Sequence, residues 1–228
     1  MERYQRHTPL YSEEEFREIR HTSIAVAGCG GLGSTVLQLL ARIGFGTIHF
    51  WDNGYLDSPD LNRQFLYKPK HIGESKIAIA LSELKEINPE LNYIPHFEKL
   101  SIDSKIDTTA KIDLVIDCLD SFASRLVLDK LFFDRGIPII HGSAFKEKGQ
   151  ITSLIPEKTA NYQSTFGIED TPEEEQCKTI FPPVVTTVAS IQITEALKYI
   201  GRHFDKMLIN KVLIIDLREN KFETISLI

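Results

Sequence analysis

A glycine-rich segment near the amino terminus has the spacing of a phosphate-binding loop. Gly28, Gly30 and Gly33 form a GxGxxG pattern between an apolar run and a helical segment. Glycine there allows a tight turn close to a phosphate, and the helix amino terminus offers unpaired N–H groups to the anion. Asp52 ends the next apolar run, where an acid accepts hydrogen bonds from ribose hydroxyls. This motif alone favours NAD, and the alternative is a glycine turn that only packs a helix on a strand.

A second polar cluster favours a nucleoside triphosphate over NAD. Arg63 lies in the loop that follows Asp52, and Lys76 lies in the first turn of the next predicted helix. A guanidinium group and an ammonium group both bind phosphate oxygens. A dinucleotide has only the pyrophosphate that the glycine loop already holds, so additional cations suit a triphosphate better. The alternative is that both residues are ordinary exposed cations.

An acidic turn follows a third apolar run, at Asp117-Cys118-Leu119-Asp120. Parallel α/β sheets bind ligands beyond the carboxyl ends of their strands. Asp120 is therefore a candidate Mg²⁺ ligand, since Mg²⁺ prefers carboxylate and phosphate oxygens. Two structural alternatives stay open: Asp120 as the cap of the helix beginning at Phe122, and Asp117 as the acceptor of a structural hydrogen bond.

The elements that would position these residues alternate between apolar runs and segments with helical periodicity. The predicted strands cover residues 23–27, 47–52, 93–97, 114–118, 137–141 and 150–155. The predicted helices cover residues 13–20, 34–43, 75–87, 122–134 and 184–200. Ser12 and Glu15 have the spacing of a capping box at the start of the first of them. This alternation predicts an α/β fold with a Rossmann-like, mostly parallel sheet and helices on both faces. Residues 211–217 and 221–228 predict a short antiparallel hairpin after the last helix.

We expect residues 1–228 to form one domain, because no linker, repeat or low-complexity tract interrupts the sequence. It divides into an arm (1–22), a nucleotide-binding core (23–155), a crossover loop (156–183) and a carboxy-terminal helix with its hairpin (184–228). The crossover loop lacks sustained periodicity, which indicates a mobile or functional segment.

Composition and charge exclude several classes of protein. The chain has 42% hydrophobic residues, a formal net charge of −6 and no apolar run of membrane-spanning length. That charge argues against a nucleic-acid partner. The first residues lack the apolar core of a signal peptide, and three cysteines without a CxxC pair form neither a disulfide framework nor a four-cysteine zinc site. We therefore expect a cytoplasmic protein without membrane attachment.

The ordered set of motifs resembles the ThiF/MoeB/HesA adenylyltransferases, which are relatives of the ubiquitin-activating enzymes. The resemblance rests on the glycine loop, Asp52 and Lys76, together with the runs Leu61-Asn62-Arg63-Gln64, Asp117-Cys118-Leu119-Asp120, Arg3-Tyr4-Gln5-Arg6-His7 and Ile191-Gln192-Ile193-Thr194-Glu195-Ala196-Leu197-Lys198. These motifs span nearly the whole chain in the order found in that family.

The resemblance implies a reaction in which Mg-ATP adenylates the C-terminal glycine carboxylate of a small ubiquitin-like sulfur carrier ending in Gly-Gly. Pyrophosphate is the other product. In the implied site, the glycine loop with Gly31 and Asn62 contacts the nucleotide and Asp52 holds the ribose. The phosphate contacts come from Arg63, Gln64 and Lys76, and Asp120 binds Mg²⁺. Arg6 reaches the triphosphate held by the partner protomer of a homodimer.

The resemblance also assigns a role to one cysteine and reveals several departures. Cys177 matches the acceptor cysteine of many family members, with an ordinary surface cysteine as the alternative, whereas Cys29 and Cys118 are expected to be packing residues. Asp60 stands where the family usually has Asn, and Ser121 also replaces an Asn. In place of the first CxxC pair of zinc-binding members the sequence has Asn161-Tyr162-Gln163-Ser164, so we predict no zinc site.

Two other classes of function remain open on the sequence. The same fold also activates carboxylates on modified tRNA or on a peptide, although the tRNA version needs a basic face that a net charge of −6 does not suggest. A non-catalytic subunit that binds NAD or ATP is the alternative outside enzymology. The joint presence of Arg63, Lys76 and Asp120 favours an enzyme.

Overall fold

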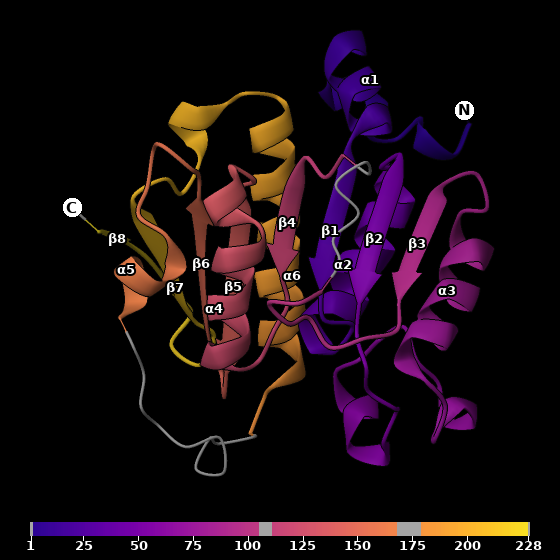
Figure 1. The fold of residues 1–228 in the computed structure, drawn as a ribbon. Coiled ribbons are helices and arrows are strands. Elements are labelled where there is room, and N and C mark those ends of the chain that lie inside the picture. The colour runs from indigo at the N-terminus through magenta and orange to yellow at the C-terminus, as the bar shows by residue number, and fades with distance from the viewer. Residues whose placement is uncertain (1, 105–110, 168–178, 228) are drawn as a thin grey trace.

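The computed structural model describes residues 2–104, 111–167 and 179–227, and it contains one eight-stranded sheet among them (Figure 1). The strand order is β3-β2-β1-β4-β5-β6-β7-β8. The first five strands are mutually parallel and the last three pair antiparallel. Their bounds are β1 Ser23–Ala27, β2 Thr47–Trp51, β3 Asn92–His96, β4 Leu114–Asp117, β5 Ile139–Phe145, β6 Lys148–Leu154, β7 Lys211–Asp216 and β8 Lys221–Ser226.

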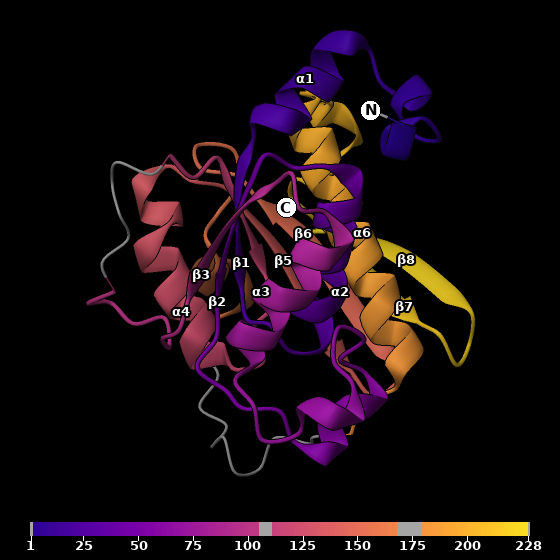
Figure 2. The ribbon, with the colours of Figure 1, turned by 90° about the vertical axis from the view of Figure 1, so that its right-hand side faces the viewer.

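Helices cover both faces of the parallel part of the sheet, as Figure 2 shows, with α4 on one face and α2, α3 and α6 on the other. The helices are α1 Glu13–His21, α2 Gly31–Ile43, α3 Lys76–Ile87, α4 Phe122–Leu131, α5 Tyr162–Phe166 and α6 Pro182–Ile200. Short 3-10 turns are η1 Glu2–Tyr4, η2 Thr8–Leu10, η3 Ser58–Asn62, η4 Pro69–His71, η5 Phe133–Arg135 and η7 Phe204–Lys206. The predicted fold class, with its terminal hairpin, is confirmed.

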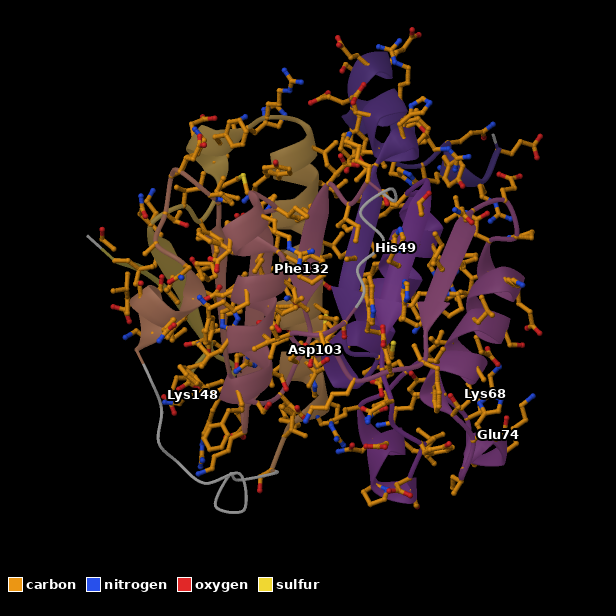
Figure 3. All side chains as sticks on the ribbon, viewed as in Figure 1. His49, Lys68, Glu74, Asp103, Phe132 and Lys148 are labelled. Carbon is orange, nitrogen blue, oxygen red and sulfur yellow. The ribbon has the colours of Figure 1, made fainter. Side chains whose placement is uncertain are left out.

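Two hydrophobic cores follow from the alternation of side chains along the central strand. Ile24 and Val26 of β1 pack under α2, α3 and α6, whereas Ala25 and Ala27 face the α4 side. Successive strand residues point to opposite faces, so one apolar run serves both layers. Phe132, which directly follows α4, is fully buried over the sheet on the α4 side (Figure 3). The two cores thus fix the parallel strands from both sides, and with them the loops that follow their carboxyl ends.

Local sequence signals explain several helix ends. The Ser12 hydroxyl accepts from the Glu15 backbone N–H and the Glu15 carboxylate accepts from the Ser12 N–H, which is the predicted capping box. The predicted helix over 122–134 is shorter in the structure, because α4 ends at Leu131 and a 3-10 turn continues to Arg135. The predicted loop over 156–183 also differs. It contains the short helix α5, and α6 begins at Pro182, since proline is tolerated in a first helical turn. Residues 168–178 of that loop lie outside the described residues.

Within the described ranges, no helix is both long and apolar enough to cross a bilayer.

Gly33 is the position where the fold depends most on the absence of a side chain. A Cβ there would overlap the carbonyl oxygen of Gly28, which is backbone and unable to swing aside. We expect Gly33→Ala to destabilise the protein by about 3 kcal/mol or more, the upper end for overpacking. Gly30→Ala is the matched control in the same loop, because its Cβ would meet nothing nearer than the Gln64 amide at 3.9 Å. Equal urea midpoints for the two variants would contradict this account.

Candidate functional site

The glycine loop connects the end of β1 to the start of α2 at the carboxyl edge of the parallel sheet. Gly28 has a φ of +94°, and a Cβ there would lie 2.8 Å from the carbonyl oxygen of Cys118. Gly30 forms the amino-terminal cap position of α2 and no side-chain oxygen caps that end. The first-turn N–H groups of α2 are therefore presented to an anion, as a phosphate-binding loop requires.

Asp52 ties the glycine loop to the turn that follows β2. Its Oδ2 accepts a hydrogen bond of 2.8 Å from the Cys29 backbone N–H, and its Oδ1 accepts one of 2.6 Å from the Gly54 N–H. Each carboxylate oxygen has a second lone pair, so these bonds orient the group without exhausting its acceptor capacity. The structure thus places Asp52 beside the loop, in agreement with its predicted neighbourhood, and its contact with ribose stays a prediction.

The two predicted phosphate-binding cations lie together. Arg63, directly after η3, and Lys76, the first residue of α3, both contact the Asp60 carboxylate, at 3.2 and 3.0 Å. A Cβ at Gly31 would lie 3.5 Å from the Arg63 Cγ, so the guanidinium stem lies against the glycine loop. Lys76 is anchored from the other side, because its backbone N–H donates to the Gly54 carbonyl at 3.0 Å. Asn62 accepts from the Arg63 guanidinium at 2.9 Å.

Gln64 lies beneath the same loop and is only 2% exposed. Its Oε1 is buried and, among the described residues, has no hydrogen-bond partner. An orphaned buried amide oxygen is costly unless a ligand or water satisfies it. The uncapped helix end and the two cations fit the phosphate groups of a nucleotide, whereas the Gln64 oxygen is an acceptor that only a donor, such as a water molecule or a ligand hydroxyl, can satisfy.

The structure places Asp120 as an exposed residue in the turn that follows β4, the strand next to β1. The alternative role of Asp120 as the cap of α4 is wrong, because Ser121 occupies that position and its hydroxyl accepts from the Ser124 N–H. Asp120 is thereby left available for another partner. In the described part of the chain, no three His, Cys, Asp or Glu side chains converge as a protein-only metal site. A single carboxylate that shares the ion with phosphate oxygens is nevertheless a common way to hold Mg²⁺.

A buried network, which the sequence reasoning missed, holds the turn that carries Asp120. The Asp117 carboxylate, 1% exposed, lies 2.7 Å from the His141 Nδ1 and 3.3 Å from the Arg125 Nε. Arg125 also donates to the Leu119 carbonyl at 2.6 Å, and Asp117 accepts from the Leu119 N–H at 2.9 Å. Burial lowers the pKa of His141, although the neighbouring Asp117 opposes that shift. The predicted structural hydrogen bond of Asp117 is confirmed.

One signal in the sequence points to this network. Arg125 follows Asp117 by eight residues and falls one turn into the helix after the strand, where its side chain reaches back toward the turn. The contribution of His141 comes from β5, and only the strand register places it opposite Asp117.

Arg6 does not join the site of its own chain. Tyr4, two residues earlier, packs against Gly44 at the carboxyl end of α2. The glycine loop lies at the other end of this 13-residue helix, about 20 Å away at 1.5 Å per residue. Figure 1 shows the amino-terminal arm and η3 at opposite ends of the sheet. Arg6 itself is exposed.

The two described cysteines and the residues in place of the first CxxC pair have separate structural roles. Cys29 and Cys118 are buried, and burial raises the pKa of both thiols well above its usual value, which agrees with their predicted packing role. Cys177 lies outside the described residues. Asn161 caps α5 and accepts from the Ser164 N–H at 2.9 Å, so the positions in place of the first CxxC pair serve as a helix cap.

The structure thus combines a Rossmann-like α/β fold with a glycine loop at the amino terminus of α2 and two cations, Arg63 and Lys76, beside that loop. A model of the ThiF family matches residues 4–227, and the chain belongs to that family. The resemblance found in the sequence is confirmed.

Curated relatives of this chain include adenylyltransferases. It is 28% identical to the SAMP-activating enzyme E1 of Haloferax volcanii, over 99% of this chain and 84% of that protein. It is 31% identical to the adenylyltransferase and sulfurtransferase uba4 of Aspergillus niger, over 80% of this chain and 40% of that protein. It is also 31% identical to a probable molybdopterin-synthase adenylyltransferase of Porphyra purpurea, over 87% of this chain and 53% of that protein. The chain therefore spans about half the length, or less, of the last two relatives.

Solved structures share the fold. The complex of Escherichia coli MccB with ATP has a TM-score of 0.82 at 21% identity, covering 93% of this chain and 66% of that one. MccB in complex with N-formylated MccA has a TM-score of 0.85 at 22% identity, covering 99% and 72%. At these identities the similarity concerns the fold alone.

Proposed function

We propose that the protein is a cytoplasmic, ATP-dependent adenylyltransferase that activates the C-terminal glycine carboxylate of a small ubiquitin-like sulfur-carrier protein. The observation that carries the proposal is the convergence of the glycine loop, Asp52, Arg63 and Lys76 at one edge of the sheet. Membership of the ThiF family and the names of the relatives, a SAMP-activating enzyme and two adenylyltransferases, support it.

The chemistry follows from the charges involved. A carrier carboxylate oxygen attacks the α-phosphorus of ATP, a new O–P bond forms, and the bond to the β-phosphate oxygen breaks. The bonding electrons leave with pyrophosphate, and no proton has to move. Because two anions meet, the residues around them must supply positioning and positive charge.

Each group of the site has a defined task in that step. The first-turn N–H groups of α2 and the Gln64 side-chain NH2 group donate to phosphate oxygens, and Asp52 orients the ribose. Arg63 and Lys76 neutralise the departing pyrophosphate. Asp120 would hold Mg²⁺, which supplies charge neutralisation at the phosphates when bound.

A homodimer completes the site in this proposal. Arg6 is exposed and lies far from the glycine loop of its own chain, so it can contact a triphosphate only in a second copy. An arm whose Tyr4 is fixed against Gly44 holds Arg6 in a defined direction for that purpose.

The exchange of labelled pyrophosphate into ATP tests the proposed function. We expect exchange that needs both Mg²⁺ and a carrier ending in Gly-Gly. Labelled pyrophosphate enters ATP only when it reacts with the acyl-adenylate, and the acyl-adenylate forms only from the carrier carboxylate. A carrier truncated by its last two residues is the matched control. Exchange that proceeds equally with the truncated carrier, or no exchange with any Gly-Gly carrier, would contradict the proposal.

Cys177 separates adenylation from any later transfer. Adenylation uses the carboxylate as nucleophile, so Cys177→Ala should keep pyrophosphate exchange within about twofold of the wild-type rate. A covalent step needs the thiolate, so the variant should lose any carrier linked through a thioester or persulfide. Exchange kinetics and non-reducing gels with intact carrier measure the two outcomes.

Brief iodoacetamide treatment provides the control for that assignment. Cys29 and Cys118 are buried thiols with raised pKa values, so both should react slowly. Peptide mass spectrometry should find Cys177 alkylated first. Preferential modification of either buried thiol would leave Cys177 without a distinctive role.

A further inference from the structure

One carboxylate lies between the two cations of the phosphate subsite. Asp60 contacts the Arg63 Nη2 through Oδ1 at 3.2 Å and the Lys76 Nζ through Oδ2 at 3.0 Å. The three side chains are 15%, 26% and 14% exposed, so solvent screens the cluster only in part. Two positive charges that suit phosphate are therefore shared with an anion of the chain itself.

Backbone contacts keep Asp60 in this position. It lies in the 3-10 turn η3, and its backbone carbonyl accepts from the N–H groups of Arg63 and Gln64. The Asp57 N–H donates to the Asp60 Oδ2 at 3.2 Å. Arg63 is folded onto the same turn, where it also donates to the Pro59 carbonyl at 3.0 Å. The carboxylate and one of its two cations thus belong to one local unit, and Lys76 reaches it from α3.

We propose that Asp60 competes with phosphate groups for Arg63 and Lys76, so that a polyphosphate must displace it from both cations. The inference rests on the proposed function, because it concerns the same subsite. Asp60 holds the two like charges close together. Once a polyphosphate arrives, the same carboxylate is a neighbouring negative charge that weakens binding and favours the release of pyrophosphate.

The proposal predicts two effects of opposite sign for Asp60→Asn, which removes the charge at nearly the same size and replaces one acceptor oxygen with an NH2 group. Without ligand, Arg63 and Lys76 lose their shared counterion, so the unfolding temperature should fall. With polyphosphate, the repulsion disappears and both cations are available, so affinity should rise by about tenfold, equivalent to roughly 1.4 kcal/mol. A residue with a purely structural role would lower stability without raising affinity.

Calorimetric titrations with ATP, pyrophosphate and adenosine distinguish the phosphate subsite from the rest of the nucleotide. In Asp60→Asn, ATP and pyrophosphate should bind about tenfold more tightly, whereas adenosine should bind as in the wild-type protein. Asp134→Asn is the matched control, since Asp134 also pairs with a lysine, Lys130 at 3.3 Å, but lies on η5 before β5. It removes one negative charge and should leave all three affinities unchanged.

Each possible result decides the proposal. Weaker or unchanged binding of pyrophosphate in Asp60→Asn would overturn it, as would an equal gain for adenosine or for the Asp134→Asn control. If the wild-type protein binds pyrophosphate but not ATP, the proposed function fails, while the pyrophosphate affinities and unfolding temperatures still test Asp60. If neither protein binds pyrophosphate, the subsite is not one for polyphosphate and the role of Asp60 is refuted with it.

Discussion

Asp120→Ala is expected to lower carrier-dependent pyrophosphate exchange by at least about 100-fold, the usual loss when a group that stabilises transition-state charge is removed. Asp120 is exposed and Ser121 caps α4 in its place, so the substitution removes no core contact and no helix cap. The unfolding temperature should therefore stay within about 2 °C of the wild-type value, as for most surface substitutions.

The control for that experiment is Asp205→Ala, which removes an exposed aspartate from η7, outside the site. Its exchange rate should equal that of the wild-type protein. A near wild-type rate for Asp120→Ala would show that the assignment of Asp120 as the Mg²⁺ ligand is wrong.

Arg6→Ala should lower exchange to a similar degree as Asp120→Ala. Mixing the two variants should reveal in which chain Arg6 acts. An Asp120→Ala chain keeps Arg6, and an Arg6→Ala chain keeps Asp120. If Arg6 serves the other protomer, each mixed dimer has one intact site of two. With random pairing in a C2 dimer, an equal mixture recovers about a quarter of the wild-type activity.

Failure of the mixture to regain activity would place Arg6 in the site of its own chain. If Arg6 acts within its own chain, every site in the mixture lacks one residue and no activity returns. The position of Tyr4 at the far end of α2 from the glycine loop argues against that arrangement. Native mass spectrometry, which resolves the mixed dimer from the two homodimers by mass, confirms that the two variants exchange protomers before the assay.

Most of the fold was predictable because each element has a local signal. Apolar runs that end in glycine or acidic turns mark the parallel strands, and Ser12 with Glu15 marks the start of α1. The short helix α5 was missed, since five residues carry no measurable periodicity and its cap is a single Asn161. The order of the eight strands was not predictable from local signals, because it depends on how non-adjacent segments pair.

The site was predictable in its residue types and only partly in its contacts. Motif spacing brought Asp52, Arg63 and Lys76 to the same edge, and the structure places them there. Spacing did not show that Asp60 already pairs with both cations. Nor did it show that Asp117, Arg125 and His141 form a buried network under Asp120, because that network joins β4, α4 and β5 through tertiary packing.

The central claim is that the carrier carboxylate becomes an acyl-adenylate, and trapping with hydroxylamine tests it most directly. Hydroxylamine attacks an activated carboxyl group and leaves the free carboxylate unchanged. Mass spectrometry of a Gly-Gly carrier incubated with the protein, Mg-ATP and hydroxylamine should detect a hydroxamate on the terminal glycine. The modification should be absent without ATP and absent with Asp120→Ala. A carrier that stays unmodified while ATP is consumed, or a hydroxamate that forms without ATP, would contradict the account.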